Sequence, residues 1–170
     1  MTRIAVVPGV LALLPEYAAQ IDPVPELRAA CLVAVGWLGA APELVADPQG
    51  ERVGRSLIQA AGVAPSMPSA EAGTEEAYLV VANGTARRSQ SSPGPYDDRA
   101  VPFDDVLAKA LLSPDPSALR GVDQALAREL WASTSALPRL AGLLRGDETV
   151  TVDYDDAPYG VQYWVVRYAR

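Results

Sequence analysis

Residues 78–82 read YLVVA, an unbroken apolar run that ends at Asn83 and Gly84. A run of this kind predicts a strand that other elements cover on both faces of its sheet. On either side of it, apolar residues recur with strand and helix periods in turn. They predict further strands at 3–7, 43–46, 149–154 and 161–168, and helices at 26–38, 51–61, 101–112, 121–132 and 137–144.

The order of these segments predicts the fold class. Strands that alternate with helices, followed by two strands around a turn at 155–160, are typical of an α/β fold. We expect a layered α/β/α domain with a mixed, mostly parallel sheet and a C-terminal antiparallel hairpin. The length of 170 residues suits one domain spanning 1–170. Residues 64–76 are rich in Pro, Ser, Ala and Gly and are predicted to be a flexible exposed loop.

Composition narrows the choice of partners and compartment. The formal net charge is −7, which favours neither nucleic acid nor an anionic membrane as a partner. No segment has the apolar length of a membrane span. The one cysteine, Cys31, cannot form a disulfide within the chain, and we expect an unreactive core thiol. A cytoplasmic protein fits this best.

The chain contains no histidine. Histidine is the usual general base near neutral pH and a common ligand of iron, zinc and copper. Its absence excludes Ser-His-Asp triads, Cys-His pairs and facial triads of two histidines and a carboxylate. The sequence therefore assigns no catalytic residue from these classes.

Three segments together resemble one family. Residues 7–16 read VPGVLALLPE, residues 84–89 read GTARRS, and residues 154–163 read YDDAPYGVQY. The first is similar to the opening of proteins related to the B subunit of class III extradiol dioxygenases, which reads Pro-His-Pro-Pro and then Pro-Glu. The second, with YDDRA at 96–100, resembles the family's central loop. The third resembles its closing hairpin, whereas residues 42–76 have no clear counterpart.

The resemblance implies an iron site that this chain has lost. Active relatives bind ferrous iron through two histidines and a glutamate and cleave catechol-like rings. The first histidine falls at Gly9, which has no donor side chain, and the second falls near Arg87 or Arg88, where a guanidinium repels a cation. We therefore expect degenerate metal positions at Gly9 and Arg88, no metal, no cofactor and no iron-dependent ring cleavage.

A cleft at the strand ends is the predicted ligand site. In α/β sheets, ligands bind beyond the carboxyl ends of the strands. A small anionic or aromatic ligand there would contact residues from the loop after 78–82 and from the closing turn, which are Asn83, Gly84, Arg87, Arg88, Asp155, Asp156 and Tyr159. In the alternative interpretation, the two arginines pair with the nearby acidic loop and Tyr159 is a packing residue.

Two other functions stay open on the sequence. One is an enzyme that uses carboxylate, arginine or tyrosine chemistry, with Mg²⁺ bound by converging aspartates. Against a metal site, Asp97 and Asp98 suit the start of the helix at 101–112, and Asp104 and Asp105 suit its N-terminal dipole. The other is an assembly subunit that forms a homo-oligomer through apolar surface.

Overall fold

The computed structural model describes residues 1–18, 20–39, 42–63 and 76–170. The predicted flexible loop at 64–76 lies outside the described residues except for Glu76. That residue is the first of strand β3 (Glu76–Val81), so its assignment to a loop was wrong. Its amide donates a hydrogen bond to the carbonyl of Met1, which places it at the start of the sheet.

One mixed sheet has five strands in the order β2-β3-β1-β5-β4. Its strands are β1 (Thr2–Val7), β2 (Glu43–Val45), β3, β4 (Thr149–Asp156) and β5 (Tyr163–Ala169). The first three are parallel, and β5 runs antiparallel to both β1 and β4. The predicted α/β fold with a C-terminal antiparallel hairpin is confirmed.

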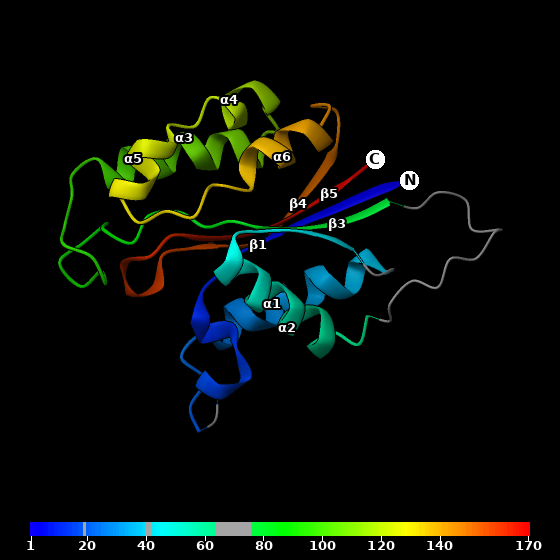
Figure 1. Ribbon diagram of the computed structural model, residues 1–170, viewed down its shortest axis with the longest axis horizontal. Helices are drawn as coiled ribbons and strands as arrows, with labels where there is room; N and C mark the ends of the chain where they lie inside the picture. Colours follow the sequence, from blue (N-terminus) through cyan, green and yellow to red (C-terminus); the bar gives the residue numbers. More distant parts are fainter. Residues whose placement is uncertain (19, 40–41, 64–75) are drawn as a thin grey trace.

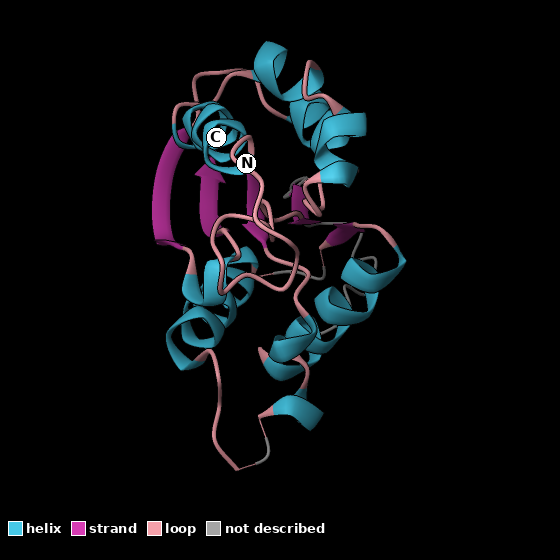
Figure 2. Cartoon of the chain, turned by 90° about the vertical axis from the view of Figure 1, so that its left-hand side faces the viewer, coloured by secondary structure: helices cyan, strands magenta, loops and turns pink. Residues whose placement is uncertain are grey.

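Helices cover both faces of this sheet (Figures 1 and 2). They are α1 (Pro25–Leu38), α2 (Pro48–Ala60), α3 (Ala100–Leu112), α4 (Pro116–Arg120), α5 (Gln124–Glu129) and α6 (Leu137–Leu143). Figure 1 shows α1 and α2 on one side and α3 to α6 on the other. None of the described helices is long and apolar enough to cross a membrane.

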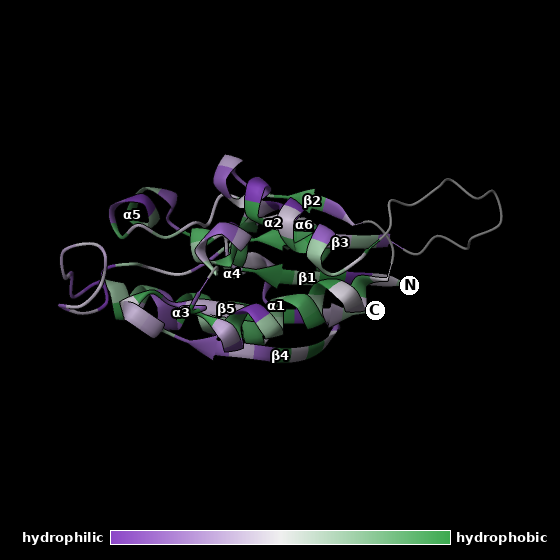
Figure 3. Ribbon diagram, turned by 90° about the horizontal axis from the view of Figure 1, so that it is seen from below, coloured by the Kyte–Doolittle hydropathy of each residue, from purple (hydrophilic) through white to green (hydrophobic). Residues whose placement is uncertain are grey.

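Strand β1 supplies residues to two cores. Ala5 and Val7 pack in the cluster under α1 and α2, whereas Ile4 and Val6 pack in the cluster under α3, α4 and α6. Successive residues of a strand point to opposite faces, so a strand between two helical layers is apolar throughout. Figure 3 shows β1 in the hydrophobic colour along most of its length.

The predicted helix at 121–132 was wrong in its extent. Asp115 caps α4 by accepting hydrogen bonds from Ser117 N and Ala118 N, and α4 ends at Arg120. Asp123 then caps α5 in the same way, and α5 ends at Glu129. The predicted helix is therefore reduced to α5, which starts where the Asp123 cap satisfies free amides, and α4 is a separate short helix before it that was not predicted.

Two other boundaries also differ from the prediction. Helix α2 begins at Pro48, three residues before the predicted start at 51, because Asp47 Oδ1 accepts a hydrogen bond from Gly50 N. Strand β4 runs to Asp156, so Asp155 and Asp156 are strand residues and not turn residues. The hairpin turn is a short 3-10 helix, Pro158–Gly160.

Candidate functional site

The candidate site lies where the parallel strands end. Gly9 follows β1 and Asn83 follows β3, and the two strands are paired to their last residues, Val7 and Val81. Gly9 N donates a hydrogen bond to Asn83 Oδ1 at 3.3 Å. This is the edge of an α/β sheet at which ligands usually bind.

Two adjoining hollows open at this edge, of about 340 and 220 Å³. They share four lining residues, which are Gly9, Gln49, Asn83 and Trp131. The larger hollow adds mainly polar residues, namely Asp47, Arg128, Ala132 and Ser133. The smaller adds mainly apolar ones, namely Val10, Ala86, Pro93, Val161 and Tyr163. The site is therefore polar at one end and apolar at the other.

Hydrogen bonds between distant segments fix the polar end. Ser133 Oγ donates to Asp47 Oδ2 at 2.8 Å, and the backbones of Ser133 and Asn83 exchange two hydrogen bonds of 3.0 and 3.1 Å. Gln49 Nε2 donates to the carbonyl of Gly9 at 2.9 Å. Because four elements contribute to this network, the lining is held in place before any ligand arrives.

Trp131 has a strained backbone beside the hollows. Its φ is +59°, which favours glycine, and 53% of its surface is exposed. It follows α5 in a Schellman motif: Ala132 N donates to Ala127 O and Trp131 N donates to Arg128 O. Glycine usually occupies this position, and another residue there costs about 1–2 kcal/mol. Strain of this kind clusters at binding sites, which makes the Trp131 ring a candidate ligand contact.

Gly84 and its neighbour Asn83 have different roles. Asn83 lines both hollows, as the strand-end prediction implied. Gly84 is buried, and a Cβ there would lie 2.6 Å from Asp104 Oδ1 and 2.7 Å from Gln162 Cβ. Its glycine identity is explained by this close packing, and not by contact with a ligand.

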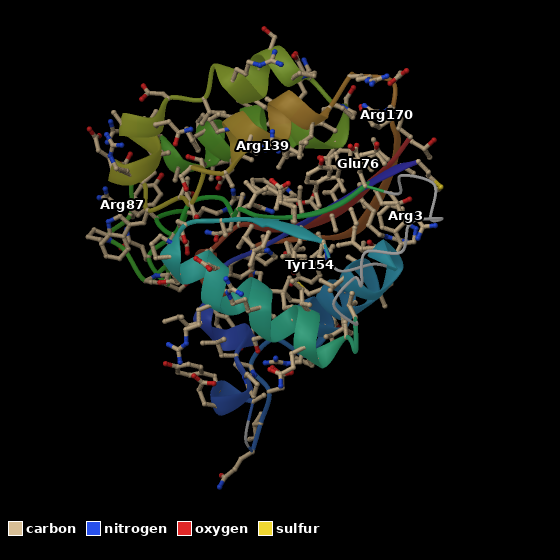
Figure 4. All side chains as sticks on the ribbon, turned by 45° about the vertical axis from the view of Figure 1, so that its right-hand side comes forward. Arg3, Glu76, Arg87, Arg139, Tyr154 and Arg170 are labelled. Carbon is tan, nitrogen blue, oxygen red and sulfur yellow. The ribbon has the colours of Figure 1, made fainter. Side chains whose placement is uncertain are left out.

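Arg87 and Arg88 are held by the protein itself. Arg87 donates to the carbonyls of Pro95 and Glu129 at 2.6 and 2.8 Å and lies 3.5 Å from the carboxylate of Asp97. Arg88 donates to Asp104 Oδ2 at 2.6 Å. Arg87 therefore pairs with the acidic loop, as the alternative interpretation expected, whereas the partner of Arg88 lies in helix α3. Figure 4 shows Arg87 near α5, at the opposite end of the molecule from Arg3 and Arg170.

Asp104 does not have the role predicted for it. It is 1% exposed, and it accepts hydrogen bonds from Thr85 N and Thr85 Oγ1 as well as from Arg88. Burial raises the pKa of its carboxyl, and the hydrogen bonds from Thr85 and Arg88 oppose that rise. Asp104 was expected to interact with the N-terminal dipole of its helix, but the first turn of α3 contains no acidic residue. Asp104 instead anchors the loop after β3 from within the core.

The residues predicted from the closing hairpin lie elsewhere. Asp155 Oδ1 accepts from Gln162 Nε2 at 2.9 Å, and Asp156 Oδ1 accepts from Ala157 N at 2.7 Å. Tyr159 is 63% exposed and donates its hydroxyl to the carbonyl of Pro23 at 3.1 Å. None of the three is among the described residues that line the two hollows. The predicted set is thus divided between the hollows, the loop after β3 and the hairpin.

The iron that the resemblance implies does not fit the donor set at this edge of the sheet. A Cβ on Gly9 would lie 3.0 Å from Val81 Cγ1 and 3.3 Å from Gly50 Cα, so the start of α2 occupies the space of a larger side chain. Among the described residues, no group of three histidine, cysteine or carboxylate side chains is placed to hold a metal ion. The described lining offers groups for hydrogen bonding, stacking and charge pairing.

Sequence reasoning missed most of the lining. Asp47-Pro48 was a readable helix start, since Asp is a favoured N-cap and Pro a favoured first residue. It would have placed Gln49 beside the strand ends. No sequence pattern predicts Trp131 as a site residue, because a positive φ is expected at glycine and not at tryptophan.

Comparison of the chain with protein-family models, with curated proteins and with solved structures found no match.

Proposed function

We propose that this protein binds a small organic molecule at the strand ends and has the scaffold of the class III extradiol dioxygenase B subunit without its iron chemistry. The observation that carries the proposal is Trp131, which lines both hollows and is half exposed although its backbone is strained. Strain persists only where the surrounding structure or a function maintains it. A binding role gives a reason for a tryptophan where glycine would be more stable.

The order of elements supports the scaffold part of the proposal. The segment at 7–16 follows β1, the segment at 84–89 follows β3, and the segment at 154–163 spans the β4–β5 turn. These are the places that the resemblance implies for the opening strand, the central loop and the closing hairpin. The part of the proposal that concerns iron rests on Gly9 and on the absence of histidine from the sequence.

A metal assay tests the iron part directly. Purified protein is incubated anaerobically with Fe²⁺, desalted and analysed for bound metal. We expect far less than one iron per chain, because oxygen donors without imidazole hold ferrous iron weakly. Stoichiometric iron that survives desalting would overturn this part of the proposal, whatever the ligand experiments show.

A ligand screen tests the binding part. Thermal unfolding is measured against a mixed library of organic acids, amides, alcohols and amines, since a ligand that binds only the folded state raises the melting temperature. Gln49→Trp places an indole at the shared part of the two hollows and should abolish each shift. Arg55→Trp, on an exposed position of the same helix, is the matched control and should leave the shifts intact.

The enzyme alternative has less support. Asp47 is the one carboxylate among the described residues that line the hollows, and both its oxygens already accept hydrogen bonds, from Gly50 N and Ser133 Oγ. A general base needs an acceptor within reach of the substrate. A library without any hit, together with an oligomer in light scattering, would favour the assembly alternative instead.

The compartment that we propose is the cytoplasm. Cys31 is fully buried in α1, and burial raises the pKa of its thiol. A thiol held protonated in an apolar core is unreactive, and a lone cysteine of this kind suits a reducing environment. Reaction with a thiol reagent under native conditions should therefore be slow and should accelerate on unfolding.

A further inference from the structure

We propose that the ligand of the strand-end hollows is a planar anion, an aromatic carboxylate, with its ring stacked on Trp131 and its charge held by Arg128. This inference rests on the proposed function and names the ligand class of the same site. It depends on three features of the lining, which are an exposed indole, an uncommitted guanidinium and the division of the site into a polar and an apolar end.

The indole of Trp131 offers a surface for stacking. One part of the ring packs against Gly94, where a Cβ would lie 3.1 Å from Trp131 Cε3. The ring also lines both hollows and is half exposed. An aromatic ligand gains from an offset stack on such a ring, beyond the apolar area that it buries.

Arg128 supplies the charge that selects an anion. It is exposed, it lies in the last turn of α5, and it lines the larger hollow. Unlike Arg87, Arg88 and Arg99, it forms no ion pair or side-chain hydrogen bond with any part of the chain that the structure describes. A guanidinium binds a carboxylate through two parallel hydrogen bonds, which gives both affinity and orientation.

The one acidic residue in the lining does not favour a cationic ligand. Asp47 Oδ1 accepts from Gly50 N at 2.7 Å and Oδ2 accepts from Ser133 Oγ at 2.8 Å. Its charge also lies at the N-terminus of α2, where the helix dipole offsets it. These contacts occupy both carboxylate oxygens of Asp47, so Arg128 is the charged side chain of the described lining whose hydrogen-bonding groups remain open to a ligand.

The two ends of the site match the two parts of such a ligand. The smaller hollow is lined by Val10, Pro93 and Val161, which suit a hydrocarbon ring. Tyr163 also lines it, and burial raises the pKa of this phenol to about 12, so it stays neutral beside the ring. The larger hollow contains Arg128 and the amides of Gln49 and Asn83, which suit a carboxylate.

The test compares three probes of nearly equal size on the full chain: naphthoate, its neutral amide naphthamide, and the saturated decahydronaphthoate. Dissociation constants come from ligand-observed NMR titration at neutral pH, with thermal unfolding as the check that each variant is folded. We expect naphthoate to bind about tenfold more tightly than naphthamide, since a charge-assisted hydrogen bond is worth roughly that factor. It should also bind more tightly than decahydronaphthoate, which has the charge without the planar ring.

Variants assign each preference to its residue. Arg128→Gln should reduce the affinity for naphthoate to that for naphthamide, whereas Arg55→Gln removes an exposed arginine outside the hollows and should change nothing. Trp131→Leu should reduce the affinity for naphthoate to that for decahydronaphthoate. Tyr17→Leu removes another exposed aromatic residue and serves as its control.

The inference is overturned if naphthoate and naphthamide bind equally well, or if Arg128→Gln leaves their difference unchanged. It is also overturned if none of the three probes binds. The library screen then separates the two proposals. A different ligand that Gln49→Trp excludes would leave the binding function standing with another ligand class, whereas a library without hits would remove both.

Discussion

Ser133 Oγ donates a hydrogen bond of 2.8 Å to Asp47 Oδ2, although 86 positions separate the two residues in the sequence. The other oxygen of the same carboxylate caps α2 through Gly50 N. One side chain therefore fixes both the start of a helix and the loop that carries the candidate site. Gln49 lies two residues after Asp47 and Trp131 lies two residues before Ser133, and both line the same hollows.

Removing the hydrogen bond between Ser133 and Asp47 should lower the free energy of unfolding, and by more when the carboxylate is the group removed. Ser133→Ala removes one hydrogen bond and should reduce the free energy of unfolding by about 1 kcal/mol. Asp47→Ala removes that bond and the N-cap together and should cost about 2 kcal/mol. Urea denaturation measures both. Ser135→Ala, at a neighbouring exposed serine, should be within about 0.5 kcal/mol of wild type. Equal stability of Ser133→Ala and Ser135→Ala would contradict the assigned role.

Two helical glycines should respond to alanine in opposite directions. A Cβ at Gly50 in α2 would lie 2.8 Å from Val81 Cγ1, whereas a Cβ at Gly36 in α1 meets nothing within 4 Å. Gly50→Ala should therefore destabilise the protein by about 1–3 kcal/mol through overpacking. Gly36→Ala should stabilise it by about 0.5–1 kcal/mol, because alanine has the higher helix propensity. Thermal unfolding of the pair is the measurement, and a Gly50→Ala variant as stable as Gly36→Ala would show that the contact with Val81 is relaxed.

The strain at Trp131 can be isolated by comparing two truncations. Trp131→Gly and Trp131→Ala lose the same ring contacts, but only alanine keeps the cost of a positive φ. The glycine variant should be more stable than the alanine variant by about 1 kcal/mol in chemical denaturation. Both should bind an aromatic ligand more weakly than the wild type. If the alanine variant were the more stable, the backbone at this position would not be strained.

The charge of Asp97, in the loop after β3, should make the stability of the protein depend on pH in the acidic range. Side-chain hydrogen bonds from Arg99 lower the pKa of its carboxyl from 3.8 to about 2. A carboxyl with a lowered pKa in the folded state adds stability above its unfolded value, and this stability is lost as the pH falls through the folded value. Asp97→Asn should therefore be less stable than wild type at neutral pH, and the difference should shrink between about pH 4 and pH 2. A stability difference between wild type and Asp97→Asn that stays constant over this pH range would show that the charge of Asp97 does not contribute to stability.

The sheet was largely predictable because its inner strands are apolar on both faces. Residues 78–82 and 161–168 are apolar on both faces, and only an inner strand of a layered fold gives every such side chain a buried place. Both lie within the sheet, in β3 and β5. Helix α4 was not predicted, and the start of α5 was placed at residue 121 because the cap at Asp123 was overlooked.

The candidate site was only half predictable. Asn83 and Gly9 follow from the rule that ligands bind beyond strand ends, and both line the hollows. Arg87 and Arg88 also follow a strand end, so the same rule predicted them as ligand contacts. Their loop instead directs both side chains to carboxylates and carbonyls of the protein. Arg128 and Trp131 reach the site through the packing of α5, a tertiary relationship that no local pattern encodes.

The antiparallel pairing of β1 with β5 has a mechanical consequence. Thr2 and Arg170 exchange two backbone hydrogen bonds, 2.8 Å from Thr2 N and 3.0 Å from Arg170 N, so both ends of the described chain leave the same side of the sheet. A force that pulls these ends apart loads one pair of bonds at a time, from the ends inward, because the bonds of an antiparallel ladder lie across the strands. The sheet should therefore open at low force, with β1 and β5 separating first.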